Sequence, residues 1–397
     1  MDLALKDIRR HAGKFVATIL GVAMLLAIVL VMNGIYQGNI ADGVWLINNT
    51  ATDLWVVERE RGGPFNESSR IPLDSYKSIA ATPGVAQASP LALYTAQRVI
   101  GGSSQQFTIV GYDVFGGLGG PGRLAQGRPL AAPHYEMVAD EKLGLSLGGK
   151  LPLGAHTYTV VGVTRGAVDS AGNPLVYLSL ADAQEVQFQQ DNRALVAARA
   201  ASLKRLERAG YTPEQATRVL PLLSTQGDTI NAVLVRLAPG ADAGAVAVHI
   251  RDWLYFNVYT TDEERELMLE GRLRKMSAVL GLFRALLVMV SIVIMALIVY
   301  VLTIEKIRSI ATLKLIGAPN RVIVRLIMEQ SLALTLASFA AAYGLRELIA
   351  PGFPRTLAFL ADETAVTFAV MLAGGVLASL MAIWHALRTP PQLALGG

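Results

Sequence analysis

The sequence contains no cysteine. This absence excludes a disulfide framework, a thiolate zinc site and a cysteine nucleophile, although it does not identify the cellular compartment. Charged residues are scarce as well, at 17% of the 397 residues, and the mean hydropathy is +0.42. Because several long runs carry no charge at all, these values indicate an integral membrane protein.

Catalytic patterns are also missing from the sequence. The five histidines are scattered, with no H-x-x-x-H pair, and there is no G-x-S-x-G elbow. We therefore predict no catalytic residue and no metal ligand. The chain by itself is not expected to be an enzyme.

Two glycine-rich patterns resemble nucleotide sites but have the wrong surroundings. Residues 144–150 match G-x-x-x-x-G-K, but Leu151 occupies the Ser/Thr position that would bind magnesium. Residues 117–122 match G-x-G-x-x-G, but Pro121 and Gly127 disfavour the helix that should follow. We interpret both patterns as turns. No cofactor is predicted in this chain, so energy from ATP has to come from a partner.

Four segments are apolar enough to cross a bilayer whose hydrocarbon core is roughly 30 Å thick. Residues 15–36 and 285–304 carry no charge, and residues 364–387 carry none if His385 is neutral. The uncharged part of residues 326–346 is shorter, but long side chains at its ends can reach the interface. We predict four transmembrane helices at these positions.

Basic residues set the orientation of the chain. They exceed acidic residues in residues 1–14, in the connection 305–325 and at Arg388, so these parts are predicted to face the cytoplasm. Residues 1–14 are interpreted as an amphipathic helix on the inner surface; a cleaved signal peptide is the weaker alternative. Both termini are therefore cytoplasmic, including the tail 388–397. The basic net charge is a topology signal, and nucleic acid is not a predicted partner.

Residues 37–260 form one large extracytoplasmic domain of α+β type. A glycine-rich stretch, 116–127, introduces a second group of short strands, so we expect an inserted subdomain at about 116–226, of barrel or sandwich type. A helical hairpin is expected near 190–223. The predicted strands are 52–58, 91–98, 107–112, 136–140, 157–163, 175–178 and 231–237, and the predicted helices include 73–81 and 243–254.

A charged helical stretch leads from this domain back to the membrane. Residues 261–284 contain no proline and no helix stop before the second span. We predict a stalk helix continuous with residues 285–304. It either transmits movement or acts only as a spacer, and both interpretations remain open.

The segment between the second and third spans is the most informative one. Residues 305–320 have helical spacing of apolar residues, and Gly317 and Pro319 supply a helix end. We predict a short amphipathic coupling helix at the cytoplasmic surface. Its candidate contact residues are Glu305, Lys306, Arg308, Ile310, Leu313, Lys314, Ile316 and Gly317.

Two further pairs stand out within the spans. Arg325 and Glu329 lie four residues apart, which places them on one helix face as an ion pair. This structural role is favoured over a proton relay. Gly34 and Gly38 form a GxxxG step, which predicts a close helix contact with a second copy of the chain; the alternative is that the glycines are merely tolerated.

The coupling segment reads Glu-Lys-x-Arg-x-Ile-Ala-x-Leu-Lys-x-Ile-Gly-Ala over residues 305–318. This pattern resembles the connection between the second and third membrane helices of FtsX/MacB/LolC-type permeases of ABC transporters. Weaker matches follow in the same order along the chain: Lys6 to Arg10, Pro83 to Val85, Ile109 to Gly111, Val160 to Val163 and Arg388 to Leu395. The sequence looks most like DevC-like permeases, which are encoded apart from their ATPase.

The resemblance implies a multi-pass protein of the bacterial inner membrane whose large domain is periplasmic. It implies a permease dimer, of two identical or closely homologous chains, bound to two ATPase subunits that hold ATP and Mg. A periplasmic adaptor and an outer-membrane channel are expected partners in addition to the lipid bilayer. The implied function is export of a hydrophobic or amphiphilic cargo through ATP-driven movement of the outer domain. Lipoprotein release and FtsX-like regulation of a cell-wall hydrolase are the alternatives.

Overall fold

The computed structural model describes residues 12–65, 67–190, 201, 203–212, 215, 229–353 and 356–388. The chain divides into two compact units. The membrane unit comprises Met1–Gly38 and Lys275–Gly397, and the outer domain comprises Asn39–Arg274. Most of the predicted helix 1–14, the tail 389–397 and much of the predicted hairpin near 190–223 lie outside the described residues.

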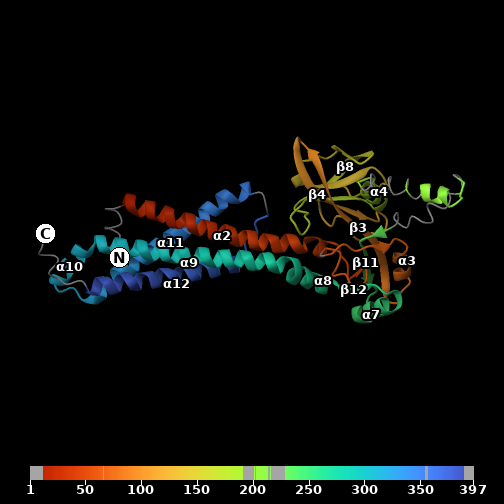
Figure 1. The fold of residues 1–397 in the computed structure, drawn as a ribbon. Helices are drawn as coiled ribbons and strands as arrows, with labels where there is room; N and C mark the ends of the chain where they lie inside the picture. The colour runs from red at the N-terminus through yellow and green to blue at the C-terminus, as the bar shows by residue number, and fades with distance from the viewer. Residues whose placement is uncertain are drawn as a thin grey trace. The chain divides into compact units, whose positions relative to one another are not determined.

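Within the described residues, four long helices match the predicted spans in number and order (Figure 1). Each contains a stretch that is long and apolar enough to cross a membrane. The structure makes every one of them longer than its predicted span, because helix continues past the uncharged core into polar flanks. The helices are α2 (Ala12–Asn49), α9 (Arg274–Glu305), α11 (Asn320–Ile349, followed by the short turn η3, Ala350–Gly352) and α12 (Ala361–Arg388).

Helix α2 continues past residue 36, the predicted end of the first span, and the predicted start of the outer domain at residue 37 lies close to Asn39, where the second compact unit begins. The helix contains 38 residues and ends only at Asn49. Residues 37–49 include no proline, and the buried side chains of Leu46 and Ile47 pack into the hydrophobic core of the outer domain. Helical structure is retained there because one face of the extension is buried.

The predicted stalk is helical throughout, with one irregular turn. Helix α8 (Thr261–Met268) begins with a capping box, in which Thr260 and Glu263 each bond the other's backbone N–H. A π-helical turn, η2 (Leu269–Leu273), joins α8 to α9. The boundary between the two compact units follows this turn, between Arg274 and Lys275.

The membrane helices pack through small residues. At Gly375 an added Cβ would lie 2.5 Å from the Thr335 hydroxyl, and at Gly374 it would lie 2.6 Å from Ile292. The Ser331 hydroxyl donates to the Gly375 carbonyl at 2.8 Å, which joins α11 to α12. Small residues allow this close approach, which stabilises helix pairs in lipid. Large apolar side chains instead lie exposed on the outer faces of the helices, among them Leu20, Met24, Leu297, Leu377 and Met381.

The GxxxG glycines are used within one chain. An added Cβ at Gly34 would lie 2.5 Å from the Phe359 ring, and one at Gly38 would overlap the Thr356 carbonyl. The Ala358 N–H also donates to the Gly34 carbonyl at 3.1 Å. The expectation that Gly34 and Gly38 face a second copy is therefore corrected. The segment before α12 already occupies that helix face.

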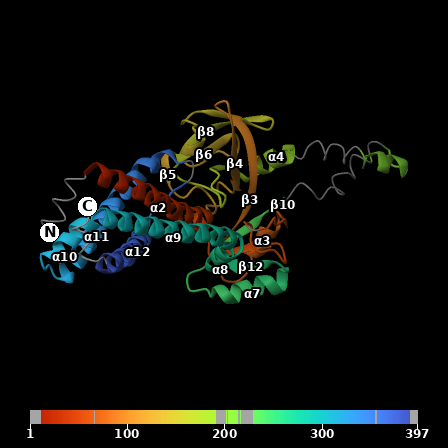
Figure 2. The same ribbon diagram turned by 60° about the vertical axis from the view of Figure 1, so that its left-hand side comes forward.

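The outer domain is built on one ten-stranded sheet (Figure 2). Its order is β12-β1-β11-β3-β4-β9-β6-β8-β5, and β7 also pairs with β8. Most pairs are antiparallel; β4 with β9 and β6 with β8 are parallel. The strands are β1 (Leu54–Val57), β3 (Val85–Ile100), β4 (Ser103–Tyr112), β5 (Leu124–Gly127), β6 (Glu136–Asp140), β7 (Lys150–Leu153), β8 (His156–Thr164), β9 (Leu175–Ser179), β11 (Ala232–Leu237) and β12 (Asn257–Thr260).

Short elements complete this domain. Strands β2 (Ile71–Pro72) and β10 (Thr229–Ile230) form a separate pair. Its short helices include α3 (Ser75–Ala80), η1 (Glu141–Leu143), α4 (Leu180–Gln190) and α7 (Ala243–Leu254). The run 144–150 lies between η1 and β7, and the run 117–122 lies between β4 and β5. The structure thus confirms that neither glycine pattern starts a helix.

The long strand β3 connects the two parts of the domain. Its residues Val85 to Leu91 pair with β11, and Leu91 to Ile100 pair with β4. Ile100 and Phe107 are buried in the same hydrophobic core as β6 and β8. The second part therefore begins within β3, earlier than the predicted boundary at about 116. The two parts share one open sheet, which corrects the expected closed barrel or sandwich for the described residues.

Candidate functional site

The candidate site is the short helix α10 (Ile307–Leu315), which confirms the predicted helix between the second and third spans. Only Lys306 separates it from the end of α9. At its other end Ala318 N–H donates to the Leu313 carbonyl at 2.9 Å, and Gly317 N–H donates to the Lys314 carbonyl at 3.1 Å. Gly317 adopts φ +90°. This is a Schellman ending, which fixes where the chain turns toward α11.

One face of α10 is anchored in the membrane unit. Ile310 and Ala311 are buried, with 1% and 0% of their surfaces exposed. Ile310 belongs to the same hydrophobic core as Met295 of α9, Ile323 of α11 and Ala386 of α12. A helix of nine residues has little stability alone. Its position is therefore set by this burial.

Lys314 supplies a polar anchor on the same side. Its ammonium group donates to the carbonyls of Ala386 at 3.0 Å and Leu387 at 2.8 Å, in the last turn of α12. These carbonyls have no partners within their own helix, and a cation near a helix C-terminus is favourable. Lys314 thus fixes α10 to the end of α12.

The opposite face of α10 is open. Ile316 is 79% exposed and Leu315 47% exposed, although both are large apolar residues. Arg308, Ser309 and Thr312 are exposed beside them. Their spacing places these side chains on one side of the helix. The arrangement is a mixed apolar and basic surface held on a rigid support, and we call these five residues the α10 face.

The structure sorts the predicted coupling residues into three groups. Glu305, Arg308, Ile316 and Gly317 are exposed, whereas Lys306 and Leu313 are half-buried. Ile310 is buried in the core and Lys314 bonds to α12, so both lie on the side of the helix opposite the α10 face and support it. Sequence reasoning missed Ser309, Thr312 and Leu315. Taking Ile310 and Ala311 as the inward side of the helix would have found them.

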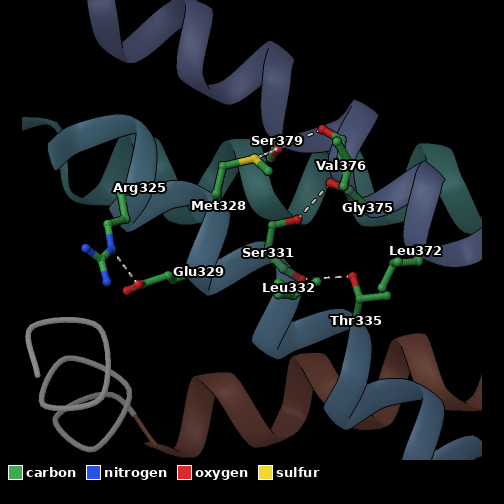
Figure 3. Close-up of a pocket in the computed structure, with 10 residues that line it drawn as sticks. All are labelled: Arg325, Met328, Glu329, Ser331, Leu332, Thr335, Leu372, Gly375, Val376 and Ser379. Carbon is green, nitrogen blue, oxygen red and sulfur yellow. Dashed lines mark hydrogen bonds and ion pairs between the residues drawn. The ribbon is translucent and has the colours of Figure 1, made fainter. Parts of the chain in front are cut away.

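The predicted ion pair lies near the start of α11, the helix that follows α10 in the chain. Arg325 Nε and Glu329 Oε1 are 2.9 Å apart, which confirms the pair. It lies at the end of a small cavity of 140 Å³ between α11 and α12 (Figure 3). The hydroxyls of Ser331, Thr335 and Ser379 along this cavity donate to backbone carbonyls and not to one another. Among the described residues the cavity therefore contains no hydroxyl chain that could act as a proton relay.

Two histidines of the outer domain pair with carboxylates of α4. His134 Nδ1 lies 2.8 Å from Asp182 Oδ1, and His156 Nε2 lies 2.9 Å from Glu185 Oε1. Within the described ranges no group of three His, Asp or Glu side chains is placed to hold a metal ion. The first pair joins the segment before β6 to α4, and the second joins the start of β8 to α4, which is a structural role.

Comparisons with known proteins cover most of the chain. A family model described as the MacB-like periplasmic core domain matches residues 15–253. A second model, the FtsX-like permease C-terminal domain, matches residues 281–391 and includes α10.

Curated relatives are similar over nearly their full length. The uncharacterized ABC transporter permease Rv2563 of Mycobacterium tuberculosis is 24% identical over 396 residues, covering 99% of both chains. The uncharacterized ABC transporter permease Rv0072 of the same species is 23% identical with the same coverage. Among solved structures, the periplasmic region of MacB from Actinobacillus actinomycetemcomitans has a TM-score of 0.36 at 14% identity, covering 57% of this chain and 96% of that one. The extracellular domain of the transporter YknZ from Gram-positive bacteria has a TM-score of 0.33 at 11% identity, covering 52% and 99%.

Proposed function

Since the chain belongs to the FtsX/MacB-type permeases of ABC transporters, we propose that it relays the movement of a separate ATPase to its periplasmic domain. ATP and Mg are bound by the ATPase subunits and not by this chain. The proposed transport function is export of a hydrophobic or amphiphilic cargo. A second permease copy, a periplasmic adaptor and an outer-membrane channel complete the proposed assembly.

The α10 face is the observation that carries this proposal. A protein partner needs an exposed patch whose centre is apolar and whose rim is polar. Ile316 and Leu315 provide the apolar centre, and Arg308 provides charge at the edge. Because Ile310 and Lys314 hold the other side of the helix, a push on this face displaces the membrane helices and not α10 alone.

A continuous helical path supports the relay to the outside. From Thr261 to Leu315 the described chain is helical through α8, η2, α9 and α10, interrupted only at Lys306. A helix rises about 1.5 Å per residue and is stiff along its axis. Force applied at the cytoplasmic end therefore has a direct mechanical route to strand β12, which precedes α8 in the outer sheet.

The membrane unit supports handling of cargo on the periplasmic side. Its largest buried cluster consists of apolar side chains drawn from all four spans and α10. Burying a hydrophilic solute among such residues is costly. A mechanism in which helices transmit movement fits this interior better than one in which a polar cargo crosses it.

The proposal is tested by co-expressing the chain with the ATPase encoded beside its gene and measuring complex formation and ATP hydrolysis in nanodiscs. We expect Ile316→Asp to release the ATPase or to reduce coupled hydrolysis at least about tenfold, because a charge replaces the centre of the contact. Val248→Asp is the matched control, since Val248 is 49% exposed on α7 of the outer domain.

Two outcomes would count against the proposal. One is a wild-type chain that binds no candidate ATPase. The other is an Ile316→Asp variant that behaves like Val248→Asp in both assays.

A further inference from the structure

A second polar cluster joins three membrane helices, α2, α9 and α12, beside the first turn of α12. Arg284 of α9 donates from Nη1 to Asn33 Oδ1 of α2 at 2.9 Å and to Glu363 Oε2 of α12 at 3.0 Å. Asn33 is buried, whereas the side chains of Arg284 and Glu363 are 32% and 30% exposed. Charge this close to a membrane-spanning segment usually has a function or a partner.

A cavity of 470 Å³ opens beside this ion pair. That volume lies in the range of ligand pockets, roughly 300 to 1,000 Å³. Arg284, Glu363 and Tyr36 form its polar part. Val288 lies one helical turn from Arg284 and Val370 lies two turns from Glu363, so the apolar wall extends about 10 Å toward the middle of the bilayer.

The ion pair leaves hydrogen-bonding capacity unused. A guanidinium group has five N–H donors, and both bonds of Arg284 come from Nη1. Within the described part of the chain, Nε and Nη2 have no partner, and neither has Glu363 Oε1. The cavity therefore presents a donor group and an acceptor group side by side, with no net charge between them.

We propose that this cavity binds one phospholipid of the outer leaflet whose headgroup is a phosphate ester of an alcohol that carries a primary amine. The phosphate accepts hydrogen bonds from Arg284, and the ammonium donates to Glu363. An acyl chain lies along Met32, Val288 and Val370. An anionic headgroup without the ammonium would offer no donor to Glu363 Oε1 and would place a second negative charge beside this carboxylate. A trimethylammonium headgroup has no N–H to donate.

A lipid bound in this cavity also holds membrane helices together. Arg284, Asn33 and Glu363 come from helices that are far apart in sequence, and the headgroup bonds to two of them. A bound lipid therefore links α9 to α12 next to the stalk. This inference rests on the membrane location of the helices and not on the proposed coupling to an ATPase.

The first test uses the wild-type full-length protein in nanodiscs that contain equal parts of phosphatidylethanolamine, phosphatidylglycerol and phosphatidylcholine. Native mass spectrometry then counts the lipids that stay bound to the protein after it is released from the nanodiscs. We expect one phosphatidylethanolamine per chain, enriched about tenfold over each of the other two lipids, because one charge-assisted hydrogen bond distinguishes them. Equal retention of the three lipids would overturn the proposal.

A second test fills the cavity without touching the ion pair. Gly281 lines the cavity, and a Cβ added there meets no atom within 4 Å. Gly281→Leu should remove the retained lipid while the protein remains folded, since leucine favours helix over glycine. Gly21→Leu in α2 is the matched control, because Gly21 also has open space around it and lies outside this cavity.

The carboxylate is tested by Glu363→Gln, which should reduce the enrichment of phosphatidylethanolamine over phosphatidylcholine to about equal. Retention of lipid by Gly281→Leu, or a change in oligomeric state instead of lipid content, would overturn the proposal. The latter result would show that a second copy of the chain fills the cavity.

Discussion

The outer domain and the membrane unit bury different side chains. The largest fully buried residues of the outer domain are aromatic: Trp55, Tyr158, Tyr177 and Phe107. In the membrane unit many buried positions are glycine, alanine or serine, and large apolar residues such as Leu297 and Trp384 are exposed. Water drives bulky apolar groups inward, whereas lipid accepts them on the surface.

The comparison shows how each unit is held together. The outer domain depends on the burial of large apolar area across the two faces of its sheet. The membrane unit depends on the close approach of helix backbones and on a few polar ties at its ends, such as Lys314 to α12. A change in side-chain size should therefore affect the stability of the two units in opposite ways. Shortening a residue should harm the outer domain, and enlarging one should harm the membrane unit.

The largest loss of stability is expected for substitution of Trp55. Trp55 is fully buried on β1 and packs against Phe65, with ring centroids 5.3 Å apart. Trp55→Ala should lower the free energy of unfolding of the outer domain by about 3 to 5 kcal/mol. Trp384→Ala is the counterpart in the membrane unit, where the side chain is 57% exposed, and it should have a much smaller effect. Limited proteolysis of both variants measures the difference; equal protection would contradict the comparison.

Glu264 in α8 provides a pH-dependent test of the outer domain. Its carboxyl is fully buried under Gly63, and among the described residues neither oxygen has a hydrogen-bond partner. Burial raises the pKa of Glu264 from 4.5 to about 8. The folded state then holds a proton that the unfolded state has lost, so stability decreases as pH rises between these two values. From pH 5.5 to 7.5 the decrease should be about 3 kcal/mol.

Glu264→Gln should remove this pH dependence. Hydrogen exchange of the α8 backbone, corrected for the intrinsic effect of pH, measures it in the full-length protein. Glu263→Gln is the neighbouring control, because Glu263 lies in the exposed capping box. A wild-type α8 whose protection does not change with pH would contradict the assignment.

Substitution of Gly38 tests whether a larger side chain destabilises the membrane unit. Any side chain there would overlap the Thr356 carbonyl, which belongs to the backbone and cannot rotate away. Gly38→Ala should lower the unfolding temperature in detergent, with a cost of about 1 to 3 kcal/mol. Gly21→Ala should be neutral or slightly stabilising, since a Cβ at Gly21 meets nothing within 4 Å. Two variants with the same behaviour would refute the intrachain contact.

The smallest effect on stability is expected at Lys314. Lys314→Gln removes a charged donor from the last carbonyls of α12 and should cost about 1 kcal/mol. Arg308→Gln, on the exposed face of the same helix, should leave stability unchanged and affect only a partner contact. Thermal unfolding followed by circular dichroism separates the two. A larger loss for Arg308→Gln would reverse the assignment of the two faces.

Much of the fold could be predicted from local signals. Strand β6 and helix α7 match their predicted bounds, because a run of regular spacing is bounded by turn residues in each case. Three of the four spans were predicted from uncharged length, and the span 326–346 was predicted from a shorter uncharged run with long side chains at its ends. Strand β12 was missed, since four partly polar residues carry little pattern and are ordered by pairing with β1. The second part of the outer domain was predicted to start at about 116, which is too late, because strand β3 belongs to both parts of this domain without a break.

The candidate site was predicted less completely, for a physical reason. Helical spacing identifies the apolar side of α10, but Ile310 and Ile316 look equally apolar in the sequence. Only the packing of Ile310 against residues as distant as Ala386 decides which one is inward. The Arg284 cluster was missed for the same reason. Its members are separated by 79 and 251 positions, and no local pattern joins them.

The central claim is that the α10 face, and not its buried side, meets a separate ATPase. Because the chain has no natural cysteine, single cysteines can be crosslinked without background to the co-expressed ATPase in native membranes. The account predicts adducts from Ser309→Cys and Thr312→Cys, and none from Ala311→Cys on the buried side or Val248→Cys on the outer domain. Adducts from Ala311→Cys alone, or no adduct from the exposed positions with an ATPase that copurifies, would contradict it.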